Sequence, residues 1–315
     1  ISKYKMENIM DLYIAIFQGI IIASTPLVLA SIGELIVEKS GVLNLGVEGM
    51  MIIGAVSSFI VTYETGSHLL GLLAAIISSG LIALIFGILT QYLLSNQVAT
   101  GLALTLFGLG LASLIGQSYS GITIESFPSL EIDILKNIPI IGDLFFAFDY
   151  LVYLSVLMVI GTYLFLNKTK RGLILIATGD NHDSAHSLGY SVKKIRLLSI
   201  IYGGACAGLG GAYLSLVQTP MWVENMTAGR GWIALAIVVF AVWRPLWIFA
   251  GAYIFGGITI IQLHIQATGV NIEAQYMSML PYVVTILVLV FISMNKNRLA
   301  VNAPNCLNKL FTSDI

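Results

Sequence analysis

The sequence predicts an all-α, polytopic membrane protein, because its composition is strongly apolar and its apolar residues come in long runs. Hydrophobic residues make up 57% of the 315 residues and charged residues only 10%, whereas about a quarter of the residues of a soluble domain are charged. Several nearly uncharged stretches reach the length of about 20 residues that a helix needs to cross a bilayer. We therefore predict one transmembrane domain over residues 1–315 with roughly 8 to 10 helical spans, some of them discontinuous.

The first predicted span is Leu12–Ser31, and Pro26 should kink it. This stretch runs into polar sequence without a small-residue cleavage motif, so we do not expect a cleaved signal peptide. A polar break is predicted over residues 33–41, and apolar sequence resumes over residues 41–61.

Three carboxylates lie in or beside these two segments: Glu34, Glu38 and Glu48. A carboxylate at the bilayer centre costs about 3 kcal/mol, so one found there faces a water-filled cavity or a partner. In the alternative interpretation, all three lie at the membrane interface and are solvated. Both interpretations stay open at this point.

The remaining spans follow from the same hydropathy argument. The stretch 231–243 is too short to cross unaided, and residues 229–231 before it are flexible and charged, which is typical of a discontinuous helix in a transporter. The glycines of residues 197–216 should let another helix approach closely. The other predicted spans cover residues 69–95, 102–117, 150–166, 197–216, 246–263 and 279–294.

Charge placement predicts the sidedness of the loops. The loop 167–196 holds Lys168, Lys170, Arg171, Lys193, Lys194 and Arg196, and the tail 295–315 is also basic, so both should be cytoplasmic. The loop 118–149 is acidic and should be external, and His68 and His264 should also lie in external loops. If all five early segments cross, Lys3 and Lys5 lie outside. They lie inside if the region from Glu34 to Glu48 is re-entrant.

One short helix is predicted within the basic loop, over residues 179–189. Asp180 or Asn181 can cap its start, Ala185 and Leu188 form a small apolar face, and Gly189 suits a left-handed stop. Its low charge and single flanking aromatic residue argue against a headgroup anchor. We therefore expect a protein partner at this helix.

No catalytic or metal-binding constellation is predicted. His182 and His186 have a metal-compatible spacing with Asp183 beside them, yet solvated or partner-facing histidines are the favoured interpretation. Cys206 and Cys306 lie on different sides of an apparent span, so neither a disulfide nor a metal pair is expected. The net charge of −1 gives no argument for nucleic acid, and no cofactor is expected. The chain has no Walker A sequence, so any ATP hydrolysis would come from another chain.

Five stretches of the chain carry a family resemblance. They are GELIVEKSGVLNLGVEGMMIIGA from Gly33, NQVATGLALTLFGLGL from Asn96, the region from Arg171 to Leu216, MTAGRGWIALAIVVFAVWRPL from Met226 and MLPYVVTILVLV from Met279. In this order they resemble the bacterial ABC-importer permeases of the branched-chain amino acid, ribose and nucleoside class. Within that class the chain looks most like the smaller permease of nucleoside or simple-sugar uptake systems. The central loop departs from the pattern at residues 179–182, and Trp243-Arg244-Pro245 adds a charge at the inner end.

The resemblance implies a role for each part of the chain. The loop helix would couple to a cytosolic ATP-binding subunit through Asp180, Asn181, His182, Ala185, Leu188 and Gly189. A second permease, with which the chain would form a heterodimer, and an extracytoplasmic substrate-binding protein would complete the importer in the bacterial inner (plasma) membrane. Candidate pathway residues are Asn44, Glu48, Gln97, Thr100, Thr227 and Arg230, each of which could instead make a helix–helix hydrogen bond.

Three other functions stay open at the level of sequence. The chain could be a branched-chain amino acid permease of the same superfamily, an ion-coupled secondary transporter that uses buried carboxylates, or a structural membrane scaffold.

Overall fold

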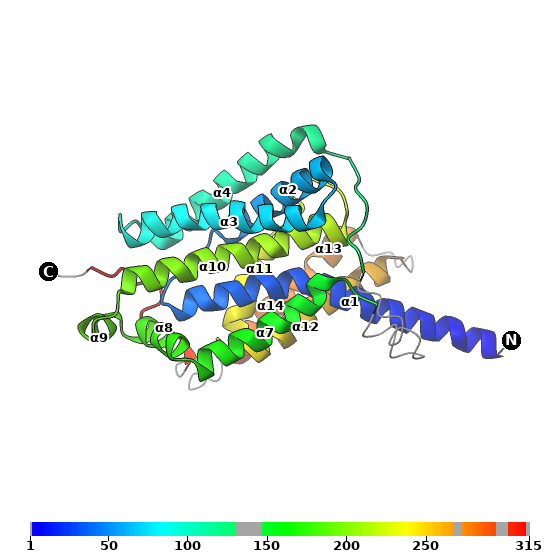
Figure 1. The fold of residues 1–315 in the computed structure, drawn as a ribbon. Coiled ribbons are helices and arrows are strands. Elements are labelled where there is room, and N and C mark those ends of the chain that lie inside the picture. Colours follow the sequence, from blue (N-terminus) through cyan, green and yellow to red (C-terminus); the bar gives the residue numbers. More distant parts are fainter. Residues whose placement is uncertain (1, 130–146, 268–272, 294–301, 313–315) are drawn as a thin grey trace.

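The computed structural model of the chain describes residues 2–129, 147–267, 273–293 and 302–312. Long helices run side by side along one axis (Figure 1). Outside these helices, the described residues form only isolated bridges, such as the one between Ser120 and Trp222. The prediction of an all-α, polytopic fold is confirmed.

The helices follow one another in chain order. They are α1 (Ser2–Lys39), α2 (Val47–Thr65), α3 (His68–Gln91), α4 (Gln97–Gly116), η1 (Gln117–Tyr119), α7 (Tyr150–Lys168), α8 (Lys170–Asp180), α9 (His182–Ser187), α10 (Val192–Tyr213), the π-helical turn η2 (Leu214–Gln218), α11 (Arg230–Phe240), α12 (Pro245–Ala267), α13 (Ala274–Ser278) and α14 (Leu280–Ser293).

Among the described residues, 7 helices are long and apolar enough to cross a membrane, slightly fewer than predicted. Two apolar helices make the difference. One is α11, whose 11 residues are too few to span alone, as predicted. The other is α14, with 14 residues as far as Ser293.

The two ends of the bundle carry different parts of the chain. In Figure 1, α9 and the segment 302–312 lie at one end, and the N-terminal start of α1 lies at the other. Lys3 and Lys5 belong to the start of α1 and so lie at the end of the bundle opposite α9. That this end faces outside stays a prediction. The predicted external loop 118–149 is described only in part, and Glu131, Asp133, Lys136 and Asp143 lie outside the described residues.

The predicted polar break after the first span is wrong, because α1 continues to Lys39. Glu34 and Glu38 are 1% and 0% exposed, so the interpretation that they are solvated is wrong as well. Glu34 accepts a hydrogen bond from the backbone N–H of Asn44 at 3.3 Å, and Glu38 accepts one from Trp243 Nε1 at 2.5 Å. One oxygen of each carboxylate thus has a protein partner, whereas Glu34 Oε2 and Glu38 Oε1 are buried without a hydrogen-bond partner among the described residues.

The connection 40–46 turns back into the bundle after α1. Gly41 makes the turn with φ +91°, a left-handed conformation that favours glycine. The backbone N–H of Leu43 is bonded to the Gln97 side chain at 2.9 Å. Since a backbone N–H inside a membrane must find a protein partner, this connection requires polar side chains at membrane depth.

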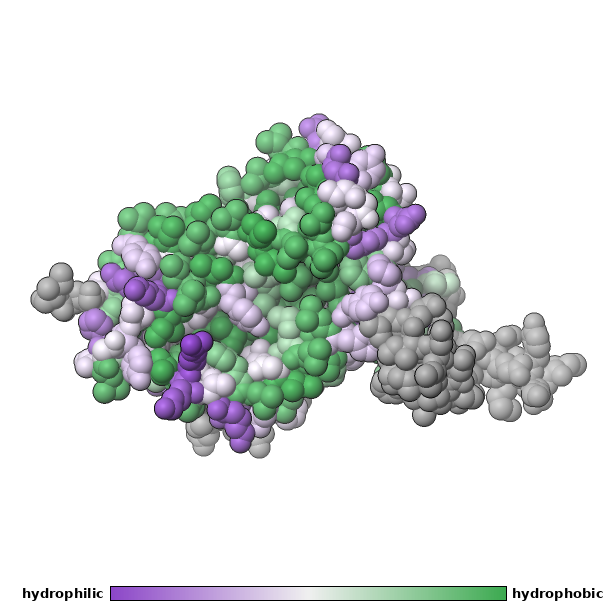
Figure 2. Space-filling view, in the orientation of Figure 1, coloured by the Kyte–Doolittle hydropathy of each residue, from purple (hydrophilic) through white to green (hydrophobic). Residues whose placement is uncertain are grey.

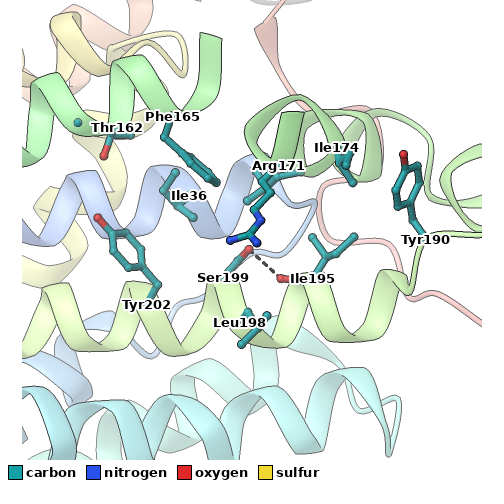
Figure 3. A pocket seen from close by; sticks show the side chains of 12 residues that line it. Ile36, Thr162, Phe165, Arg171, Ile174, Tyr190, Ile195, Leu198, Ser199 and Tyr202 are labelled. Atoms are coloured by element: carbon teal, nitrogen blue, oxygen red, sulfur yellow. Dashed lines mark hydrogen bonds between the residues drawn. The ribbon is translucent and has the colours of Figure 1, made fainter. Parts of the chain in front are cut away.

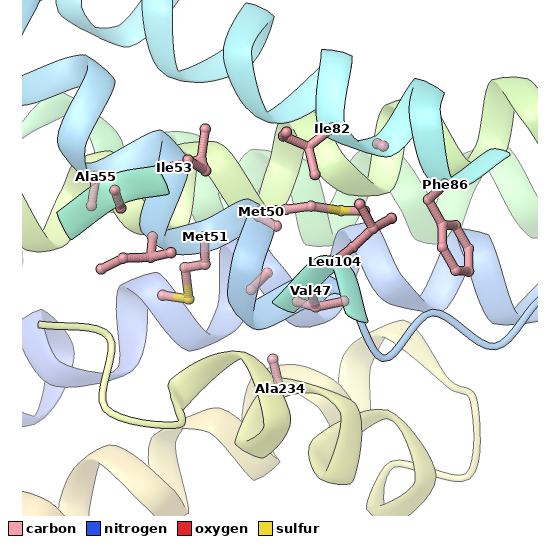
Figure 4. Packing of buried hydrophobic residues seen from close by; sticks show 14 of the residues in the cluster. Val47, Met50, Met51, Ile53, Ala55, Ile82, Phe86, Leu104 and Ala234 are labelled. Carbon is pink, nitrogen blue, oxygen red and sulfur yellow. The ribbon is translucent and has the colours of Figure 1, made fainter. Parts of the chain in front are cut away.

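The largest apolar cluster lies where α2 meets α3, α4 and α10, around Met50, Met51 and Phe86 (Figure 4). Glycines on α10 bring the helices together: a Cβ added at Gly208 would meet Ser79 of α3, and one at Gly211 would meet the Met51 carbonyl oxygen of α2. The predicted packing role of this glycine-rich span is confirmed.

The outer surface of the bundle is largely apolar. Figure 2 shows apolar side chains along its flanks and polar ones gathered toward its ends. Exposed leucines include Leu106 on α4 and Leu157 on α7. Such a surface suits contact with lipid. The two histidines predicted in external loops belong to helices instead, since His68 begins α3 and His264 lies in the last turn of α12. Their external side stays a prediction.

Candidate functional site

Two helices, α8 and α9, form an elbow at the end of the bundle that carries the basic loop. Thr169 caps α8 by accepting a hydrogen bond from the Gly172 N–H at 3.0 Å, and Asn181 caps α9 by accepting one from the Ser184 N–H at 3.0 Å. Gly189 follows with φ +88°. The predicted Asn181 cap and left-handed Gly189 are confirmed. The predicted single helix over residues 179–189 is wrong, because Asp180 ends α8 and α9 covers only His182–Ser187.

Ala185 and Leu188 do not share a face of α9, contrary to the sequence prediction. Ala185 is buried in a small cluster with Val192 and Phe311. Leu188 points away from this cluster and is 77% exposed. Phe311 comes from the tail, so sequence near α9 could not reveal which residues of that helix are covered.

His182 is buried rather than solvated, which corrects its predicted setting. Its Nδ1 accepts a hydrogen bond from Arg196 Nη2 at 3.1 Å. Arg196 is fully buried and also donates to the carbonyl oxygens of Ser40 at 3.1 Å and Lys309 at 3.0 Å. One guanidinium thus joins α9, α10, the 40–46 connection and the tail. Burial, and then the charge of Arg196, lower the pKa of His182.

The C-terminal segment 302–312 crosses this end of the bundle as a strap. The Cys306 N–H donates to the Gly179 carbonyl oxygen at 2.8 Å, and Lys39 Nζ donates to the Asn302 carbonyl oxygen at 2.8 Å. The Phe311 ring packs edge-on against His182 with a centroid separation of 5.3 Å. The tail therefore ties α1 to α8 and α9. The two cysteines are free, and the described residues contain no group of three or more metal-ligating side chains.

A second polar site lies inside the bundle, where Glu48 of α2 meets the start of α11. The Glu48 carboxylate accepts hydrogen bonds from Thr227 Oγ1 at 2.5 Å, from the Gly229 N–H at 2.8 Å and from the Gly231 N–H at 2.6 Å. Glu48 is 2% exposed, so solvation at the interface is wrong for this carboxylate too. A negative charge complements the unpaired N–H groups and partial positive charge at a helix N-terminus. Glu48 thus fixes the short helix α11 against α2.

The other predicted pathway residues lie around this site or near it. Asn44 is buried and accepts from the Gly46 N–H at 3.0 Å. Thr100 is hydrogen-bonded to Ser95 at 2.9 Å, and Arg230 donates to the Met226 carbonyl oxygen at 2.7 Å. Together with Gln97, which holds the 40–46 connection, all six predicted residues have protein partners here. Whether they line a pathway stays a prediction.

The structure gives three residues long-range partners that the sequence did not predict. Arg196, Phe311 and Trp243 each meet a partner far away in the chain. An arginine near the start of an apolar helix was the only available signal for Arg196, and it was interpreted as cytoplasmic charge. No local pattern marked Phe311 as part of the elbow.

Comparisons with known proteins give the family of the chain. Residues 16–289 match the family model described as the permease component of the branched-chain amino acid transport system. The chain is 38% identical to TsgC13 of Haloferax volcanii, designated a candidate glucose ABC transporter permease, with 93% of this chain and 96% of that one covered. It is 30% identical to the guanosine ABC transporter permease NupQ of Bacillus subtilis, with 90% of this chain and 93% of that one covered.

A third relative is the nucleoside ABC transporter permease NupC of Lactococcus lactis, at 30% identity with 90% of this chain and 93% of that one covered. No solved structure matches. The candidate membrane spans and the family match are consistent with the predicted location, a multi-pass protein of the bacterial inner membrane. The chain belongs to the family of branched-chain amino acid transport system permease components and is an ABC transporter permease.

Proposed function

We propose that this chain is the smaller permease of an ATP-driven importer for nucleosides or simple sugars. The observation that carries the proposal is the identity of 30% to 38% to permeases named for glucose, guanosine and nucleosides, over at least 90% of this chain. In the proposed importer, a second permease completes the substrate pathway, separate ATPase subunits supply the energy and an extracytoplasmic binding protein delivers the solute.

The exposed side of α9 is the proposed contact with the ATPase. Leu188, which directly follows α9, is a large apolar side chain that is 77% exposed, and apolar anchors of this kind often dominate the energy of a protein interface. The opposite side of α9 is covered by Phe311. The side of the elbow with Leu188 is therefore free to contact another subunit, and the side with Ala185 is packed against the bundle.

Force applied to α9 would reach the membrane part through Arg196. Because its guanidinium bonds His182, Ser40 and Lys309, displacement of α9 would move the start of α10 and the 40–46 connection together. That connection leads directly into α2 and Glu48. The proposed transmission thus runs along hydrogen-bonded backbone and one buried side chain.

The proposed pathway lies beside the junction of α2 and α11, next to Asn44, Glu48, Gln97, Thr100, Thr227 and Arg230. Hydrogen bonds within the chain close the described part of this site. Opening would exchange some of these bonds for contacts with water or solute. A short helix anchored at one end by a carboxylate could make that exchange without breaking a long span.

Two experiments test the proposal. The substitution Leu188→Glu should abolish co-purification of the ATPase, whereas Leu310→Glu, at an exposed apolar side chain of the tail, should not. Undiminished binding by Leu188→Glu would rule out α9 as the contact. Uptake competition among labelled guanosine, ribose and leucine would separate the proposed substrates from a branched-chain amino acid, since leucine should not compete.

A further inference from the structure

We propose that a groove between α7, α8 and α10 binds an acyl chain of an anionic phospholipid, with the lipid headgroup held by Arg171. The groove has a volume of about 580 Å³ and includes Ile36 of α1 in its floor. Binding of the lipid does not depend on the proposed substrate or on ATP-driven transport.

The lining of the groove is hydrocarbon along most of its length. Figure 3 shows Thr162 and Tyr202 toward one end, Ile36, Phe165 and the Arg171 side chain in the middle, and Ile174 and Tyr190 toward the other end. Along α10 the lining runs from Ile195 to Tyr202, which is about 10 Å at 1.5 Å per residue. This shape suits an extended apolar chain better than a compact polar solute.

Charge selects the kind of lipid. Arg171 lies near the start of α8, and its guanidinium points into the middle of the groove beside Ser199 in Figure 3. None of the described residues that line the groove is acidic. A cation at the headgroup level beside an apolar groove complements a lipid that carries a negative headgroup and a hydrocarbon chain.

The groove opens on the surface that faces the bilayer. Leu157 and Leu164 on α7 and Leu198 on α10 are large, exposed apolar side chains on the helices that flank it. Gly161 lies in the lining, and a Cβ added there would meet no atom within 4 Å. The end of the groove near Thr162 and Tyr202 therefore has free space that membrane lipid can enter from the side.

Photo-crosslinking tests this site. The full chain, with whatever subunits co-purify, is placed in bilayers that contain phosphatidylglycerol or phosphatidylcholine with a diazirine on the acyl chain, and crosslinks are mapped to α7 and α10. We expect about fivefold more labelling from phosphatidylglycerol, since one basic residue near an anionic headgroup contributes about 1 kcal/mol. Arg171→Gln should remove that preference, whereas Lys168→Gln, at a lysine outside the lining, should retain it.

A second pair of substitutions tests the groove itself. Gly161→Leu should fill the end of the groove near Thr162 and lower labelling of α7 and α10 several-fold. Gly110→Leu, at another glycine with no atom within 4 Å of an added Cβ, should leave that labelling unchanged. Equal labelling from the two lipids would mean ordinary bilayer contact and would overturn the proposal. So would labelling that Gly161→Leu leaves unchanged, or crosslinks showing that a helix of another subunit fills the groove.

Discussion

Arg196 and His182 define the protonation state of the elbow. Arginine can only donate, so the His182 Nδ1 atom, 3.1 Å from Arg196 Nη2, must accept. The proton of the neutral imidazole is therefore on Nε2, which lies 3.6 Å from the Asp183 carboxylate. A second proton on His182 would place two cations in contact.

Acid should therefore loosen the elbow. The lowered pKa of His182 means that His182 takes up a proton more readily when the elbow is detached from Arg196 than when it is attached. Attachment of the elbow therefore weakens as pH falls below about 6.5. Hydrogen exchange in α9 and residues 302–312, corrected for intrinsic rates, should rise between about pH 7 and pH 5.5. His182→Gln, which keeps an acceptor but cannot titrate, should flatten this change. The same change with pH in His182→Gln as in the exposed variant His186→Gln would be inconsistent with this assignment.

Replacing Arg196 by lysine should destabilise the cytoplasmic end. Lysine keeps the charge but cannot match the planar fork that reaches His182, Ser40 and Lys309 together. We expect a loss of at least about 2 kcal/mol in the free energy of unfolding, measured by denaturant titration in detergent. Lys194→Ala, at an exposed neighbour, should change little. An equal effect of the two substitutions would show that the buried bonds contribute nothing specific.

Removing the Glu48 carboxylate should release the start of α11. Glu48→Ala leaves the N–H groups of Gly229 and Gly231 without their partner, and we expect a loss of about 2 kcal/mol or more. Glu48→Gln keeps one acceptor oxygen and should lose less. The free energy of unfolding and the rate of solute uptake should both be highest for the wild type, lower for Glu48→Gln and lowest for Glu48→Ala. Glu64→Ala serves as a surface control, and a Glu48→Ala protein as stable as that control would refute the anchoring role.

Close helix packing predicts contrasting effects of two glycine substitutions. Gly211→Ala would drive a Cβ into the Met51 carbonyl oxygen, whereas Gly110→Ala would meet nothing within 4 Å. Overpacking of this kind costs about 1 to 3 kcal/mol, so the thermal midpoint of the Gly211 variant should fall while that of the Gly110 variant stays or rises. Equal midpoints would mean that α2 and α10 can separate freely.

Hydropathy and local chemistry predicted much of the fold. Span positions depend on the composition of about 20 consecutive residues, and the Asn181 cap and the left-handed Gly189 depend on immediate neighbours. These features were therefore accessible from sequence, as was the packing role of the glycines on α10. The short helix α11 was predicted because its length alone excludes an unaided span.

The errors arose where a distant segment decides the outcome. Glu38 appeared to break the first helix, but Trp243, 205 residues away, provides its hydrogen bond. Ala185 and Leu188 looked like one apolar face until Phe311 covered only the first of them. His182 looked solvated because its partner Arg196 belongs to another helix. Periodicity cannot reveal partners of this kind.

Reconstitution with and without the ATPase tests the division of labour most directly. Liposomes should hold either this chain with its companion permease and ATPase, or this chain alone, each with an imposed proton or sodium gradient. We expect uphill uptake of nucleoside or sugar only in the complete assembly, only with ATP and only with the binding protein present. Uphill uptake by the chain alone on an ion gradient would contradict the proposed function and would favour an ion-coupled transporter that uses Glu34 and Glu48.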